Sequence, residues 1–244
     1  MINVSNLSKN FGQYKALNKV SFNVKAGEVY GLLGPNGAGK TTTLRILATL
    51  LKADSGTAHI NGFDIKSQSE AVRSCIGVVN GGMGLYDRLT GHEILHYFAK
   101  LYGLGKAATD KRIKDLDGLL NLGDALAKRS NSFSTGMKQK IVIARAVLHD
   151  PAIIFFDEAS SGLDVMARRA VLDFVKAYPS EARAVIYSTH VMSEVEELCD
   201  RVGIIYQGSL IAEDSVPNLI EQTQTSSLEQ AFFKLVEHSE LVSA

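Results

Sequence analysis

The loop sequence Gly34-Pro35-Asn36-Gly37-Ala38-Gly39-Lys40-Thr41 is the strongest structural signal in this chain of 244 residues. It follows a short apolar run at residues 28–33 and precedes leucines at helical spacing, which is the strand, loop and helix context of a P-loop. Glycines let successive N–H groups and the helix N-terminus point at phosphate oxygens. Lys40 is expected to reach the β- and γ-phosphates of a nucleotide, and the Thr41 hydroxyl to ligate Mg²⁺. The residues expected to bind the nucleotide are Gly34, Pro35, Asn36, Gly37, Ala38, Gly39, Lys40, Thr41 and Thr42.

A second candidate segment, Ile153-Ile154-Phe155-Phe156-Asp157-Glu158, is an apolar run that ends in two carboxylates. A buried strand of a parallel sheet would place Asp157 at its carboxyl edge, where ligands bind in open α/β sheets. On these residues alone, a plain surface strand end is an equally good interpretation. Together with the P-loop, the segment predicts Asp157 as a Mg²⁺ ligand and Glu158 as the catalytic residue that polarises a water for attack on the γ-phosphate.

His190 ends another apolar run, at residues 184–188, and is therefore expected at the same edge of the sheet. A lone histidine at a strand end is usually solvated or packed. Beside the two carboxylates, we interpret His190 as a catalytic residue that contacts the γ-phosphate and partners Glu158.

The segment Phe133-Ser134-Thr135-Gly136-Met137 precedes a run of apolar residues at helical spacing. A hydroxyl and an amide at a helix N-terminus can bind an anion. On these residues alone, a plain helix cap by Ser134 is the better interpretation. The order along the chain, in which the segment lies between the P-loop and Asp157-Glu158, favours a phosphate contact by Ser134 and Gly136.

The periodicity of the chain changes twice. Residues 1–65 alternate and include an Asn61-Gly62 turn, which is typical of antiparallel strands. Residues 90–149 have helical spacing and begin at a Thr90 to Glu93 capping box. After residue 151, strands and helices alternate, with a helix expected to open at a Ser193 to Glu196 box. This alternation predicts a parallel sheet with right-handed crossovers.

Composition excludes several classes of protein. The 26 basic side chains balance the 26 acidic ones, which argues against binding nucleic acid by bulk electrostatics, and 45% hydrophobic residues exclude disorder as the main state. Cys75 and Cys199 have no metal-ligand or redox spacing and are interpreted as buried structural thiols. The longest uncharged stretch, residues 74–86, is too short to span a bilayer, so a cytoplasmic chain is expected unless a partner holds it at a membrane.

In order and spacing, these motifs resemble the nucleotide-binding subunit of an ABC transporter over about residues 2–215. The family motifs are the P-loop, the signature at residues 133–137, the Walker B segment at 153–158, the D-loop at 161–164 and the switch histidine His190. The resemblance implies an α/β fold, with a RecA-like P-loop NTPase core, an antiparallel β-subdomain and an α-helical insertion. It also implies that two copies pair head to tail, so that Ser134 and Gly136 of one complete the ATP site of the other. Asp164 and an adenine-stacking Phe11 would join that site.

The expected domain organisation follows from the same resemblance. An ABC ATPase domain would cover residues 1–220. Its core and β-subdomain would occupy residues 1–80 and 151–215, and its helical insertion and signature helix residues 81–150. Residues 216–244 would form a polar, then amphipathic, tail.

The signature and the Q-loop depart from the family pattern. The usual signature is LSGGQ, whereas this chain has Thr135 for the first glycine and Met137 for the glutamine, with the serine and second glycine kept. In the Q-loop, Gly81 takes the place of the metal-binding glutamine. Asn80 carries an amide one position earlier on a side chain shorter by one methylene, so the sequence leaves open whether Asn80 serves instead.

Within the family, the chain most resembles ATPases of ABC-2-type exporters, particularly the sodium-extrusion branch. The resemblance implies a MgATP-dependent ATP hydrolase that is peripheral on the inner face of the membrane and drives a separately encoded polytopic permease. A non-transport ABC ATPase and a nucleotide-sensing module with little turnover are the alternatives.

Overall fold

The N-terminal region forms a four-stranded antiparallel sheet in the computed structural model, which describes residues 1–243. The strand order is β2-β1-β4-β5, with β1 at Ile2–Phe11, β2 at Tyr14–Val24, β4 at Ser55–Ile60 and β5 at Phe63–Asp64. Asn61 and Gly62 link β4 to β5 with φ values of 51° and 88°. Both turn residues therefore have the positive φ that a type I′ hairpin needs, and the predicted turn is confirmed.

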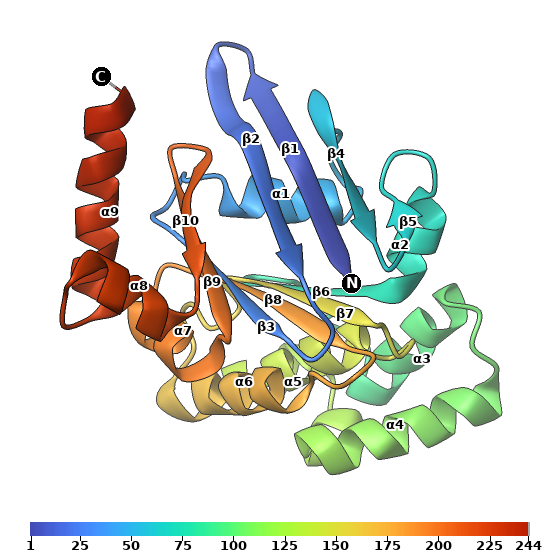
Figure 1. Cartoon of the computed structure of the whole chain (residues 1–244). Helices are drawn as coiled ribbons and strands as arrows, with labels where there is room; N and C mark the ends of the chain where they lie inside the picture. The colour runs from blue at the N-terminus through green and yellow to red at the C-terminus, as the bar shows by residue number, and fades with distance from the viewer. Residues whose placement is uncertain (244) are drawn as a thin grey trace.

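A six-stranded sheet lies next to it in the order β10-β9-β3-β8-β7-β6 (Figure 1). Its strands are β3 (Val29–Leu33), β6 (Ile76–Asn80), β7 (Ile153–Asp157), β8 (Ala184–Thr189), β9 (Arg201–Tyr206) and β10 (Ser209–Asp214). The β6, β7, β8, β3 and β9 strands run parallel, and β10 pairs antiparallel with β9. This result confirms the parallel sheet predicted from the alternating pattern.

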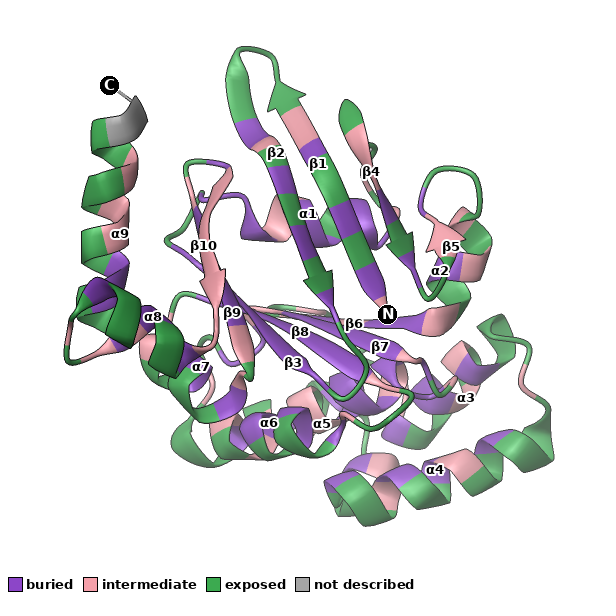
Figure 2. Cartoon of the chain, viewed as in Figure 1, coloured by how far each residue is buried: buried purple, intermediate pink, exposed green. Residues whose placement is uncertain are grey.

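The central strands of this sheet are largely buried (Figure 2), and their alternate residues belong to two different hydrophobic cores. Ile153 and Phe155 of β7 pack toward α1 (Lys40–Leu47) and the antiparallel sheet, whereas Ile154 and Phe156 pack toward the opposite face. The α1 helix lies between the two sheets (Figure 1). The helical spacing of leucines continues to Leu51, but α1 ends at Leu47, because Thr49 adopts a left-handed φ of 61°.

The opposite face of the six-stranded sheet is covered by α5 (Thr135–Ala146) and α6 (Val165–Ala177) (Figure 1). The helical insertion also contains α3 (Gly91–Leu101) and α4 (Lys106–Leu120), followed by short 3₁₀ turns at Gly123–Leu126 and Ser130–Ser132. Thr90 and Glu93 form both hydrogen bonds of the predicted capping box at the start of α3. The α2 helix (Ser69–Cys75) connects the antiparallel sheet to β6.

The C-terminal helices close one side of the molecule. The α7 helix (Met192–Leu198) begins before the predicted Ser193 cap, with Val191 as its N-cap; the Val191 N–H donates to the Thr189 hydroxyl at the end of β8. Ser193 therefore lies inside the helix, and its predicted capping role is wrong. The α8 (Val216–Thr223) and α9 (Leu228–Ser243) helices share an apolar cluster with β3, β9 and α7. They are packed onto the core by this cluster.

Two expectations drawn from composition, buried cysteines and a chain without a membrane-spanning segment, can be compared with the structure. Cys75 and Cys199 are free thiols and are partly rather than wholly buried, and burial raises the pKa of both. Among the residues described, none of the helices combines the length and the apolar character needed to cross a bilayer.

Candidate functional site

The P-loop connects β3 to α1 and uses its glycines where a side chain would collide with the backbone. A Cβ at Gly34 would lie 2.2 Å from the Ile205 carbonyl oxygen, and one at Gly39 would lie 2.7 Å from the Ala16 carbonyl oxygen. Gly39 has a φ of 110° and is the N-cap of α1. Because glycine offers no capping side chain, the first-turn amides of α1 are available to an anion.

Lys40 is the first residue of α1, and its side chain is only 3% exposed. Its ammonium group donates to the carbonyl oxygens of Gly34 and Pro35 at 2.8 and 3.0 Å. It also lies 3.3 Å from Glu158 Oε1. The ammonium is therefore held over the loop by three oxygen atoms, one of which belongs to the predicted catalytic carboxylate.

Asp157 ends β7 and accepts hydrogen bonds from two hydroxyl groups. The Thr41 and Ser188 hydroxyls each donate to Asp157 Oδ1 at 3.1 Å. Parallel pairing sets this arrangement, because Asp157 is in register with Ser188 of β8 on one side and with Asn80 of β6 on the other. The structure thus brings together the two predicted metal ligands, Thr41 and Asp157.

A cleft of about 360 Å³ lies beside these residues, lined by Thr41, Arg45, Asn80, Gly81, Gly82, Asp157, Glu158 and Ser161. Within the described chain, Asn80 Oδ1 is buried without a hydrogen-bond partner. A buried carbonyl oxygen without a partner is costly unless a ligand satisfies it. Hydroxyl, carboxylate and amide oxygens are the donors that Mg²⁺ prefers, so this set fits the ion.

Gly81 cannot be replaced by the usual glutamine without moving the backbone. Its N–H donates to the Asp157 carbonyl oxygen at 3.0 Å, and a Cβ there would lie 2.9 Å from the Glu158 carbonyl oxygen. The amide that reaches the cleft therefore comes from Asn80.

Glu158 follows β7 directly and has a left-handed φ of 50°. Such a conformation is uncommon outside glycine and recurs at functional sites. Its Oε1 atom, which contacts Lys40, also lies 3.5 Å from His190 Nδ1 at the end of β8. The three predicted catalytic residues therefore meet at one carboxylate oxygen.

Two aromatic residues stand at the mouth of the P-loop. Phe11, which is 50% exposed, lines a cleft of about 320 Å³ together with Tyr14, Ala16, Asn36, Gly37, Gly39, Lys40, Thr41, Thr42 and Glu158. The Tyr14 hydroxyl donates to the Gly37 carbonyl oxygen at 3.0 Å. Tyr14 was not predicted as a site residue. Its proximity to Phe11 in sequence, across the tight turn after β1, is the signal that could have identified it.

Ser134, Gly136 and Asp164 lie elsewhere. Ser134 Oγ accepts from the Met137 N–H at 3.2 Å, and Asp164 Oδ1 accepts from the Ala167 N–H at 2.9 Å, so both cap their own helices. These helices, α5 and α6, lie across the six-stranded sheet from α1 (Figure 1). The described chain therefore does not bring the signature residues to its own P-loop.

Comparison with known proteins agrees with this architecture. Residues 17–161 match the family model described as "ABC transporter". The chain is 41% identical to the ABC transporter ATP-binding protein NatA of Bacillus subtilis over 242 residues, covering 97% of this chain and 98% of the relative. It is 36% identical to the linearmycin resistance ATP-binding protein LnrL of the same organism, covering 95% and 77%.

Solved structures agree as well. An ATP-binding subunit of an ABC transporter superposes with a TM-score of 0.87 and 30% identity, over 97% of this chain and 99% of the other. A dimeric ATP-binding cassette in a post-hydrolysis state with ADP and Pi gives 0.77 and 25%, over 88% and 98%. The predicted ABC ATPase architecture is confirmed. The chain belongs to the ABC transporter family, as an ATPase subunit that couples ATP hydrolysis to transport.

Proposed function

We propose that this chain hydrolyses MgATP in an ABC-2-type exporter and drives a separately encoded polytopic permease from the cytoplasmic face of the membrane. The observation that carries the catalytic part is the meeting of Lys40, Glu158 and His190 at one oxygen atom beside Thr41 and Asp157. Relatives support the exporter part, since they include a daunorubicin/doxorubicin resistance ATP-binding protein of Streptomyces peucetius at 38% identity, covering 89% of this chain and 66% of the relative.

The residues have distinct proposed roles. Thr41, Asp157 and the Asn80 amide oxygen would hold Mg²⁺, which when bound would neutralise charge on the phosphates. Lys40 exchanges its contact with Glu158 for phosphate oxygens, because charge-assisted bonds to phosphate are strong. Glu158 is then free to accept a proton from the attacking water, and His190 holds Glu158 and the γ-phosphate in place.

The partner ATPase is proposed to be a second copy arranged head to tail. Ser134 and Gly136 lie on the far side of the sheet from their own P-loop, and the residues after Asp164 are strongly exposed and apolar. Val165 is 82% exposed and Met166 is 79% exposed. Such side chains are typical of a surface that a partner covers.

For the cargo, we propose the sodium ion, on the sequence resemblance to the sodium-extrusion branch. Efflux from vesicles that contain this chain and its co-purified permease distinguishes sodium from a drug-like cargo. ATP-dependent loss of sodium supports the proposal, and drug efflux without sodium movement contradicts it.

The test of the ATPase assignment is Glu158→Gln. We expect ATP binding to be kept, turnover to fall by about 100-fold or more, and an ATP-bound dimer to accumulate on size-exclusion chromatography. The matched control is Glu181→Gln at an exposed carboxylate, which should leave all three properties unchanged. Wild-type turnover in Glu158→Gln would contradict the catalytic role. Absence of turnover in the wild-type chain with its permease would instead favour a nucleotide sensor.

A further inference from the structure

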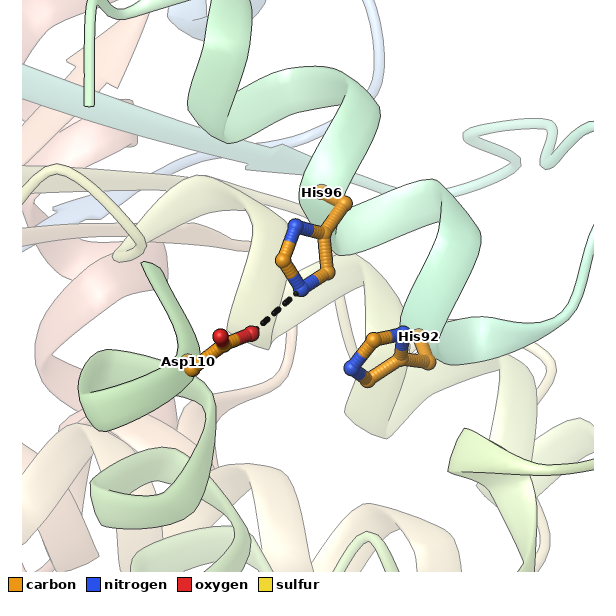
Figure 3. Close-up of side chains that lie close together, drawn as sticks. All are labelled: His92, His96 and Asp110. Carbon is orange, nitrogen blue, oxygen red and sulfur yellow. Dashed lines mark ion pairs between the residues drawn. The ribbon is translucent and has the colours of Figure 1, made fainter. Parts of the chain in front are cut away.

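The helical insertion carries a cluster of metal-ligating side chains that the ATP site does not use. His92 and His96 lie one turn apart on α3, with ring centroids separated by 4.4 Å, and Asp110 faces them from the first turns of α4 (Figure 3). The spacing of the two histidines, i and i+4, places both imidazoles on one face of the helix. The three residues therefore converge between two helices that are joined by a short loop.

The ligand atoms lie close enough to share one ion. One nitrogen of each histidine and one oxygen of Asp110 all lie within 4.8 Å of one another. His96 Nε2 approaches Asp110 Oδ1 to 2.8 Å, yet within the described chain this buried nitrogen makes no contact with hydrogen-bond geometry. The two atoms therefore lie side by side, at a place where both could ligate one cation.

We propose that His92, His96 and Asp110 form a binding site for a divalent transition-metal ion of the zinc class. Two imidazole nitrogens and one carboxylate oxygen suit Zn²⁺, Co²⁺ and Ni²⁺ and do not suit Mg²⁺, which takes oxygen donors. Tetrahedral Zn²⁺ with bonds of about 2.0–2.1 Å spaces its ligand atoms about 3.4 Å apart. The pair at 2.8 Å needs to open slightly, which is feasible because Asp110 is 49% exposed and His92 is exposed.

The sequence His92-Glu93-Ile94-Leu95-His96 also matches the H-E-x-x-H pattern, in which the glutamate serves as the general base of a metallopeptidase. Here the Glu93 carboxylate accepts a hydrogen bond from the Thr90 backbone N–H at 2.8 Å. This bond and the one from the Glu93 N–H to the Thr90 hydroxyl complete the capping box. Because the Glu93 carboxylate is engaged in capping α3, it is not placed to act as a general base, and the proposed site binds an ion rather than hydrolysing a peptide.

A bound ion would tie α3 to α4. Three protein ligands leave a further coordination position for water or for an external ligand. The ion would stabilise the folded insertion by mass action, since the ligand set exists only when the two helices are packed together.

The test is a titration of the nucleotide-free chain with Zn²⁺ by calorimetry in excess Mg²⁺, which keeps the oxygen-lined ATP site occupied. We expect one Zn²⁺ per chain and a rise in the thermal unfolding midpoint. His92→Ala, His96→Ala and Asp110→Asn should each weaken binding by about tenfold or more. Visible absorption of bound Co²⁺ should report nitrogen ligation and disappear in the two histidine variants.

The matched control is His59→Ala, which also removes an imidazole beside a carboxylate, since His59 Nε2 lies 4.0 Å from Asp64 Oδ2. This control and Glu93→Gln should bind Zn²⁺ as the wild type does. Circular dichroism checks folding, and the exposed His92 provides the decisive variant if the half-buried His96 cannot be replaced. Absence of binding, a loss of less than about tenfold in His92→Ala, or an equal loss in His59→Ala overturns the proposal.

Discussion

The P-loop cleft and the signature segment contain similar side chains but use them differently. In the cleft, side chains from three parts of the chain point at one another, as when Thr41 and Ser188 both donate to Asp157. In the signature segment, the Ser134 hydroxyl caps its own helix, α5, by accepting a hydrogen bond from the Met137 N–H. One chain therefore builds only the P-loop half from its own residues, which agrees with the proposal that the signature half acts on a partner.

Among variants that test this difference, Lys40→Ala should have the largest effect on ATP affinity, because it removes the buried ammonium group of the P-loop. We expect ATP affinity to fall by about 100-fold, or about 3 kcal/mol, because the charge-assisted bonds to phosphate are lost. Equilibrium binding of a fluorescent ATP analogue measures the effect. The thermal midpoint checks that the variant folds, and unchanged affinity in a folded variant would contradict the P-loop assignment.

The second prediction separates the two halves directly. Gly136→Ala should leave ATP binding to the isolated chain unchanged but lower steady-state turnover by about tenfold, because only the partner's nucleotide is affected. The new Cβ would lie 3.6 Å from Ala167 Cβ, an ordinary contact, so the helix should tolerate it.

The control for this variant is Gly118→Ala on α4, where an added Cβ would have no atom of the described residues within 4 Å. It should stabilise the helix by up to about 1 kcal/mol and leave turnover unchanged. If Gly136→Ala turned over ATP as fast as Gly118→Ala, the signature half would have no role at the partner's site.

Sequence reasoning succeeded where one short segment contains both the backbone requirement and the chemistry. The P-loop is such a segment, because its glycines are needed at left-handed or crowded positions beside Lys40. Reasoning failed where the outcome depends on a contact between segments. The start of α7 is one case, because its N-cap is Val191, whose N–H donates to the Thr189 hydroxyl at the end of the neighbouring strand.

Asn80 is the other instructive case. The sequence shows an amide one position before the expected glutamine, but the register of β6 against β7 is what places it beside Asp157. That its buried Oδ1 atom has no hydrogen-bond partner among residues 1–243 follows only from the three-dimensional structure of the cleft. The departure at Gly81 was therefore visible in the sequence, whereas the position of the Asn80 amide in the cleft was not.

The third prediction follows from that placement. Asn80→Ala should raise the Mg²⁺ concentration needed for half-maximal hydrolysis by about fivefold, because one of three proposed oxygen ligands is removed. A Mg²⁺ titration at saturating ATP measures it. The exposed Asn131 provides the control Asn131→Ala, and an equal Mg²⁺ requirement in the two variants would remove Asn80 from the metal site.

The smallest expected effect on ATP affinity comes from Tyr14, which contacts the P-loop at Gly37. Tyr14→Phe removes the hydroxyl that donates to the Gly37 carbonyl oxygen, a single exposed hydrogen bond worth about 0.5 kcal/mol. Because this bond orders the loop before the nucleotide arrives, its loss should lower ATP affinity by roughly twofold, with turnover at saturation unchanged. Equilibrium binding and steady-state kinetics separate the two quantities. A fall in saturated turnover would instead place Tyr14 among the groups that act in the chemical step.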